Sequence, residues 1–273
     1  MPRTTHRVQF QGHSDNTLAG ILELPSENPL GFVLFSHCFT CNKDLKAIVR
    51  ISRELAERGW GVLRYDFSGL GGSSGDFSQT NFSTNRLDLQ RAIDFLSSEY
   101  TYPAFLMGHS FGGAASMSLA ESSLVKGVVA VASPSDTHHL ADLLHHMDPS
   151  ISATGTGEVT IGGRKYRIEK QMIDDFRSHD LRSMVRSMAK PLLVFHSPTD
   201  ETVGFFHAKL NCGWGDDLQT SPPKHNRSLI SLPNCNHLLT TNDEDCRFVA
   251  EMSDAWFRRI LASQPAIFSQ TPG

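Results

Sequence analysis

The stretch Ala104-Phe105-Leu106-Met107-Gly108-His109-Ser110-Phe111-Gly112-Gly113 joins an apolar run to a serine flanked by glycines. The apolar part is typical of a buried strand, and the small residues from Ala114 to Ala120 are typical of a helix. A G-x-S-x-G pattern between a strand and a helix indicates a sharp turn that lifts the serine clear of a sheet. Because Gly108 and Gly112 lack a Cβ, neighbouring backbone can approach a Ser110 held in a strained conformation. We therefore interpret Ser110 as a nucleophile rather than an incidental serine in a glycine-rich turn.

Outward from this turn, short apolar runs alternate with helical patterns along all 273 residues. A strand pair is expected at 8–10 and 18–24, further strands at 31–37, 60–67, 127–132, 191–196 and 228–232, and helices at 43–58, 82–96 and 243–261. Such alternation predicts an α/β fold with a mostly parallel, doubly wound sheet. The chain has the length of one large α/β domain, so we expect a single domain over residues 1–273.

The alternation is interrupted by a segment at about 134–189, and this segment is too long to be a single crossover connection between two strands. Gly162-Gly163 between two short strand patterns predicts a hairpin with a two-residue turn. A helical stripe through Leu140, Leu143, Leu144 and Met147 is expected before it, and two amphipathic helices after it, carrying Phe176 and Met184. An insertion after the middle strands lies near their carboxyl ends, where open α/β sheets bind ligands. We therefore expect a small cap, with Phe176 and Met184 as candidates for an acyl pocket or, alternatively, for core.

Two partners for Ser110 follow predicted strands. Asp200 lies just past the strand ending at His196, and His237 lies just past the strand ending at Leu232. In a parallel sheet these carboxyl ends share one edge, and the chain order Ser, Asp, His is that of a hydrolase triad. A serine hydroxyl needs a neutral imidazole to accept its proton, and the imidazole needs a carboxylate to fix its tautomer. We predict Ser110 as nucleophile, His237 as base and Asp200 as its orienting acid.

An oxyanion hole requires amide donors beside the nucleophile. One is expected from Phe111, directly after Ser110, and the other from Phe39, in the loop after the strand that ends at His37. Both His37 and His109 flank this region and are expected to hydrogen-bond to its loops.

The chain resembles the α/β-hydrolase family, and more narrowly the bacterial hydrolases that occur fused to a C-terminal OsmC-like domain. The resemblance rests on HCFTC followed by KDL at 37–45, RYDFSGLG at 64–71, GHS at 108–110, IGGR at 161–164, HSPTDETVG at 196–204 and HLL at 237–239. It implies esterase chemistry on a Ser110, Asp200 and His237 triad. Two departures stand out: an OsmC-like part is missing from this chain, and the stretch 212–223 looks inserted.

Composition excludes several other classes. A net charge of −4 without a basic run argues against nucleic acid as a partner. No stretch approaches the length of a membrane span, and no signal segment opens the chain, so we expect no membrane association. Five scattered cysteines fit a reducing cytoplasm. The expected partner is a small ester substrate; acyl specificity and a homo-oligomeric state are left open.

Three other patterns suggest different chemistry. Glycines at 69, 71, 72 and 75 resemble a nucleotide loop, but no helix starts directly after them. A metal clasp of His138, Asp142 and His145 is weighed against a solvated cap surface, and the surface is preferred. Cys38 and Cys41 form C-x-x-C, which we interpret as packing thiols, with a redox pair as the alternative; a bond between them is expected to distort the Phe39 loop.

The predicted function is therefore cofactor-free and metal-free hydrolysis of carboxylic esters by a serine hydrolase. A thioesterase, an acyltransferase or a peptidase on the same triad, or a non-catalytic binding module with this fold, are the alternatives.

Overall fold

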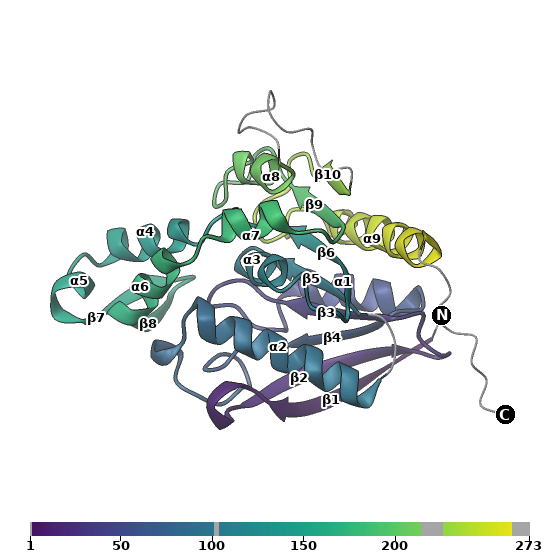
Figure 1. The fold of residues 1–273 in the computed structure, drawn as a ribbon, viewed down its shortest axis with the longest axis horizontal. Coiled ribbons are helices and arrows are strands. Elements are labelled where there is room, and N and C mark those ends of the chain that lie inside the picture. Colours follow the sequence, from purple (N-terminus) through teal and green to yellow (C-terminus); the bar gives the residue numbers. More distant parts are fainter. Residues whose placement is uncertain (1, 101–103, 214–225, 264–273) are drawn as a thin grey trace.

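The computed structural model describes residues 2–100, 104–213 and 226–263. Most of the stretch 212–223 lies outside these residues. Eight strands form one sheet in the order β1-β2-β4-β3-β5-β6-β9-β10, as Figure 1 shows. The strands are β1 (Arg3–Gln11), β2 (Thr17–Pro25), β3 (Phe32–Ser36), β4 (Gly61–Tyr65), β5 (Ala104–His109), β6 (Val125–Val131), β9 (Leu192–His196) and β10 (Arg227–Ser231).

The sheet is parallel from β4 to β10, while β1 and β2 pair antiparallel at one edge. All residues of β3, β4, β5 and β9 are buried, as expected for strands covered by helices on both faces. In the register, Ser36 pairs with Gly108, His109 with Val131, and Ser231 with His196. The carboxyl ends of these strands therefore meet at one edge of the sheet.

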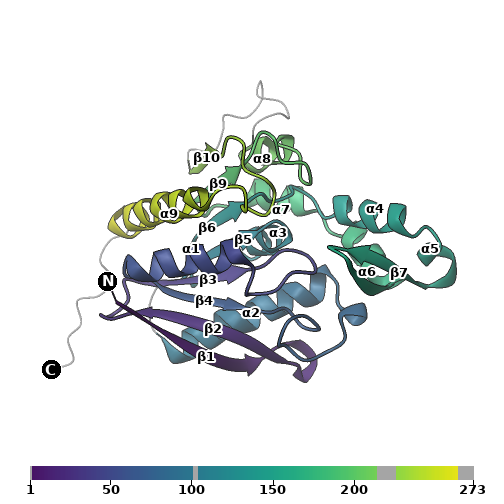
Figure 2. The ribbon, with the colours of Figure 1, turned by 180° about the vertical axis from the view of Figure 1, so that it is seen from behind.

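Helices cover both faces, which confirms the predicted doubly wound α/β sheet. One face carries α1 (Lys46–Glu57) and α9 (Asp243–Ser263), which pack together over a core that includes Trp60, Phe105 and Phe257. The other face carries α2 (Phe82–Glu99) and α3 (Phe111–Ser118). Figure 2, which views the molecule from behind relative to Figure 1, shows the face that carries α1 and α9. Short 3₁₀ turns are η1 (His13–Asp15) and η2 (Phe77–Gln79), and α8 (Phe206–Asn211) follows β9.

Between β6 and β9 the chain forms the predicted insertion, which we call the cap. It contains α4 (His138–Met147), α5 (Ile151–Thr154), the hairpin β7 (Thr156–Ile161) and β8 (Arg164–Glu169), α6 (Lys170–Ser178) and α7 (Leu181–Ser187). Gly162 and Gly163 both have positive φ, 57° and 76°, so the two-residue turn needs residues without a Cβ. In Figure 1 the cap hairpin, α4, α5 and α6 extend to the side opposite the chain termini.

The cap shares a hydrophobic core with the sheet. Ile168, Met172 and Phe176 belong to the same buried cluster as Leu106 and Phe111. The predicted stripe on α4 is correct for Leu140 and Leu144 but wrong for Met147, which is 44% exposed. Met147 is the last residue of α4, so no further turn of that helix covers its side chain.

Candidate active site

Ser110 lies in the predicted sharp turn between β5 and α3. Its backbone has φ 53° and ψ −119°, a conformation that non-glycine residues rarely adopt. A Cβ on Gly108 would stand 2.2 Å from the carbonyl group of Gly112, and one on Gly112 would stand 2.2 Å from the Ser36 oxygen. Glycine at both positions therefore lets α3 begin directly against the ends of β5 and β3.

The structure brings Ser110, His237 and Asp200 into one chain of hydrogen bonds. The Ser110 Oγ lies 3.1 Å from His237 Nε2, and the His237 Nδ1 lies 2.9 Å from Asp200 Oδ2 and 3.1 Å from Oδ1. In this arrangement Nδ1–H donates to the carboxylate, so Nε2 is free to accept the serine proton. All three residues are more than nine-tenths buried.

Asp200 is held as a carboxylate. Its Oδ1 accepts hydrogen bonds from the amides of Thr202 at 2.9 Å and Val203 at 2.8 Å. Burial alone raises the pKa of a carboxyl, but the hydrogen bonds from His237 and these two amides outweigh it, so the pKa of Asp200 is below its ordinary value. Asp200 is therefore a carboxylate at neutral pH.

The backbone amides of the two predicted oxyanion residues, Phe39 and Phe111, have no hydrogen-bond acceptor among the described residues. Phe111 is the first residue of α3, where an amide has no acceptor within its own helix. The rings of Phe39 and Phe111 lie 5.7 Å apart in an edge-to-face contact. The predicted oxyanion residues are thus neighbours, and their role stays a prediction.

In the loop after β3, Cys38 and Cys41 form a disulfide, so the interpretation as packing thiols is wrong. The tight turn brings their Cα atoms to 5.3 Å, within the range that a disulfide spans. Thr40 inside the ring has φ 61°, and the Cys41 amide donates to the Cys38 carbonyl at 3.2 Å. The turn that carries Phe39 is thus closed both by the disulfide and by a backbone hydrogen bond, and the triad is hydrogen-bonded with the disulfide in place.

We expect the Cys38→Ser/Cys41→Ser double variant to have a lower kcat than the oxidised protein, by up to about 10²-fold, because a looser loop misplaces the Phe39 amide. Reductant should lower the kcat of the wild type and leave the double variant unaffected. The remaining cysteines, at 212, 235 and 246, are buried, and burial raises the pKa of each thiol to about 12, 12 and 11. Equal kcat in the two oxidation states would contradict this expectation.

Buried histidines brace the loops around the triad. The expectation for His37 and His109 is confirmed: His37 Nδ1–H donates to the Cys38 carbonyl at 2.8 Å, and His109 Nε2–H donates to the His237 carbonyl at 2.7 Å. His196 has the same kind of role, which was not predicted from the sequence: its Nε2–H donates to the Val203 carbonyl at 2.7 Å. The sequence feature that indicates this role is the same for His196 as for His109: each is the last residue of a buried strand.

Two buried histidines, His109 and His207 of α8, are expected to make the stability of the fold sensitive to acid. Burial lowers the pKa of His109 to about 3 and that of His207 to about 4. Between these values and about 6.5 the unfolded chain binds protons that the folded chain does not. Each pH unit lost in this window therefore lowers the free energy of unfolding by up to about 1.4 kcal/mol per histidine. The pKa of His13, raised mainly by its hydrogen bond to Asp88, acts in the opposite sense, but it is one group against four, because burial also lowers the pKa of His37 and His196.

We therefore expect Tm to fall between pH 7.5 and pH 5, measured by circular dichroism. In His109→Gln the fall should be shallower, because one buried proton acceptor is gone. A Tm that is flat across this range would contradict the account.

The two candidate pocket residues have different surroundings. Phe176 is fully buried, and its ring lies 5.9 Å from that of Phe39 and 5.8 Å from that of Phe111. Met184 lies half-buried on α7, which packs on α3 and α8. Phe176 thus reaches the oxyanion residues, and substrate contact by either side chain stays a prediction.

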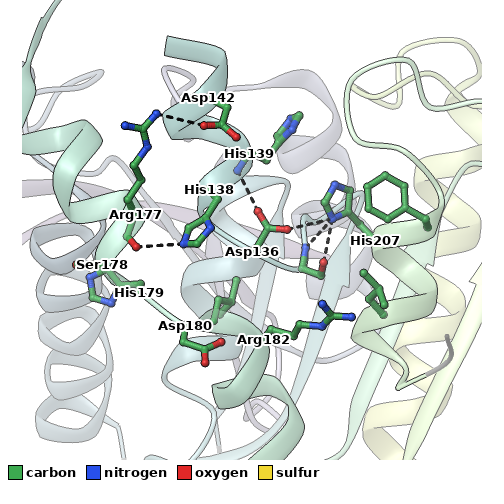
Figure 3. Close-up of a pocket in the computed structure, with 14 residues that line it drawn as sticks. Asp136, His138, His139, Asp142, Arg177, Ser178, His179, Asp180, Arg182 and His207 are labelled. Atoms are coloured by element: carbon green, nitrogen blue, oxygen red, sulfur yellow. Dashed lines mark hydrogen bonds and ion pairs between the residues drawn. The ribbon is translucent and has the colours of Figure 1, made fainter. Parts of the chain in front are cut away.

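A polar cavity of about 650 Å³ opens between the cap and α8, and Figure 3 shows its lining. Neither Ser110 nor His237 lines it. The metal-clasp residues are engaged separately: Asp142 pairs with Arg177 at 3.3 Å, and His138 donates to the Arg177 carbonyl at 3.1 Å. His145 instead lies 3.2 Å from the Ser152 hydroxyl. Within the described ranges no group of three or more His, Cys, Asp or Glu side chains is placed to hold a metal ion.

The glycine-rich loop after β4 is filled by the protein's own groups. Asp66 accepts from the amides of Gly72 at 2.8 Å and Lys43 at 2.7 Å and pairs with the Lys43 ammonium at 2.7 Å. A Cβ on Gly71 would stand 2.2 Å from the Asp66 carboxylate. The loop therefore binds a buried carboxylate of this chain, which ties it to the segment that follows Cys41.

Comparisons with known proteins show what the chain as a whole is similar to. The family described as serine aminopeptidase, S33, matches residues 27–152. The esterase domain of a Rhodothermus marinus protein is 40% identical, with a TM-score of 0.73 over 95% of this chain and 99% of that one. A structure of Est1E from Butyrivibrio proteoclasticus with ferulic acid bound is 20% identical, with a TM-score of 0.77 over 94% and 100%. Mouse alpha/beta hydrolase domain-containing protein 10 is 18% identical, with a TM-score of 0.72 over 93% and 99%.

The last two similarities show the fold alone, whereas the first extends to the sequence. No curated protein matches the chain. Among the helices that the structure describes, none is long and apolar enough to cross a bilayer.

Proposed function

The chain belongs to the α/β-hydrolase family as an esterase-like serine hydrolase, and on this premise we propose that it cleaves carboxylic esters through an acyl-enzyme intermediate. The observation that carries the proposal is the continuous hydrogen-bonded chain from Ser110 through His237 to Asp200.

In the first half-reaction, Ser110 Oγ attacks the ester carbonyl carbon while His237 Nε2 takes the hydroxyl proton. The carbonyl oxygen becomes an oxyanion that accepts hydrogen bonds from the Phe39 and Phe111 amides. The C–O bond to the alcohol then breaks, and the alcohol leaves with the proton that His237 held. Asp200 stabilises the imidazolium between these two proton transfers.

In the second half-reaction, a water molecule gives a proton to His237 and attacks the acyl carbon. Collapse of the second tetrahedral intermediate breaks the bond to Ser110, and His237 returns the proton to Oγ. Acid and serine are regenerated, and each step uses only side chains, backbone amides and water.

The test is turnover of a panel in which one acyl group is presented as an oxygen ester, a thioester and an amide. We expect the highest kcat/KM for the oxygen ester. The acyl series should run from acetyl to hydroxycinnamoyl, because a protein of the same fold binds ferulic acid. A kcat/KM that is highest for the thioester or the amide would assign the triad to one of those reactions instead.

A further inference from the structure

Among the described residues, one hydrogen bond joins the cap to the loop after β3 that carries Phe39. Tyr166, on strand β8 of the cap hairpin, donates its phenol hydroxyl to the Thr40 carbonyl at 3.1 Å. Thr40 follows Phe39 directly, and the two bonded residues are 126 positions apart in the sequence. The contact therefore exists only because the cap docks against the loop after β3.

The peptide groups around Thr40 need such support. Thr40 is β-branched and has φ 61°, a conformation that is costly for a side chain of this shape. Its own hydroxyl donates to the Phe39 carbonyl at 2.7 Å, and the disulfide closes the turn around it. The direction of the Phe39 amide depends on this turn, so a hydrogen bond on the Thr40 carbonyl helps to set that direction.

Ring contacts join the same parts. The Tyr166 ring lies 5.2 Å from that of Phe77, which lies 5.5 Å from that of Phe39. The Phe39 ring also contacts those of Phe111 of α3 and Phe176 of the cap helix α6. The side chain of Phe39 is thus held between the cap and the helix that begins after Ser110.

From these contacts we propose that Tyr166 is a positioning residue, through which the cap hairpin holds the Phe39 amide in place for the oxyanion. This role rests on the function proposed above. It makes the cap part of the apparatus that stabilises the transition state, in addition to any part it has in covering substrate.

Tyr166→Phe tests the role, because it removes only the hydroxyl and keeps the ring on Phe77. We expect kcat to fall by about 2- to 12-fold with KM unchanged, which is the range for one hydrogen bond. Affinity for a trifluoromethyl ketone analogue, which forms an oxyanion on Ser110, should fall by the same factor, while affinity for the product acid stays the same. Tyr100→Phe is the matched control: it removes the same atom at the end of α2, and its kinetics should not change.

Several outcomes would overturn the role. If Tyr166→Phe has an unchanged kcat, with or without a lower Tm, the hydrogen bond to Thr40 does not position the Phe39 amide for catalysis. A raised KM at unchanged kcat would place the phenol in direct contact with substrate. Ser110→Ala in the same assay separates the two claims: if it is inactive and Tyr166→Phe is unchanged, this role alone fails, whereas an active Ser110→Ala overturns the proposed function and this role with it.

Discussion

Ser110→Ala is expected to lower kcat for ester hydrolysis by about 10⁴- to 10⁶-fold. The alanine has no nucleophile, so His237 has no proton to accept and no acyl-enzyme forms. The fold should persist, because the methyl group occupies the space of the serine Cβ and the backbone strain at this position is the same for both residues. The change is measured as kcat on the best ester of the panel, together with a thermal melt.

Ser118→Ala, on the same helix as the turn but in contact with Arg86 rather than the triad, is the matched control and should keep its activity. A well-folded Ser110→Ala protein with near wild-type turnover would contradict the mechanism.

Asp200→Asn is expected to lower kcat by about 10⁴-fold, the second-largest effect. The amides of Thr202 and Val203 donate to Oδ1, so an asparagine would keep its carbonyl oxygen there and turn its NH₂ group toward His237. An NH₂ group cannot accept from Nδ1–H, so the imidazole shifts its proton to Nε2 and can no longer take the proton of Ser110.

The measurement is kcat on the best ester of the panel, with Asp136→Asn as control. Asp136 accepts the His139 amide at 2.9 Å and lines the polar cavity, and its amide form can still accept that bond. A loss of less than tenfold in Asp200→Asn would show that the carboxylate does not orient the base.

The sheet and the triad could be predicted because both depend on local patterns joined by one topological rule. Continuous apolar runs such as 104–107 and 192–195 are typical of strands that are buried on both faces. Once these strands are parallel, the residues that follow them share one edge. Ser110, Asp200 and His237 therefore converge without any knowledge of their distances.

The contacts that hold the loops could not be predicted in the same way. The bond between Cys38 and Cys41 depends on a turn that packs Thr40 in a left-handed conformation, which no periodic pattern indicates. The Tyr166 hydrogen bond depends on how the cap docks, and a hairpin pattern gives the strand pairing but not its tertiary contacts. The prediction for Met147 was wrong because helical spacing does not show where a helix ends, and the last residue of α4 is exposed.

The measurement that tests the central claim most directly is covalent labelling with a fluorophosphonate, followed by mass spectrometry of the peptides. A fluorophosphonate reacts with a serine that a neighbouring base has activated and gives a stable adduct in place of the acyl-enzyme. The account predicts one equivalent of label, located on Ser110, with turnover lost in proportion to labelling and no labelling of Ser110→Ala. A protein that hydrolyses esters while Ser110 stays unlabelled, or that carries the label on another residue, would contradict it.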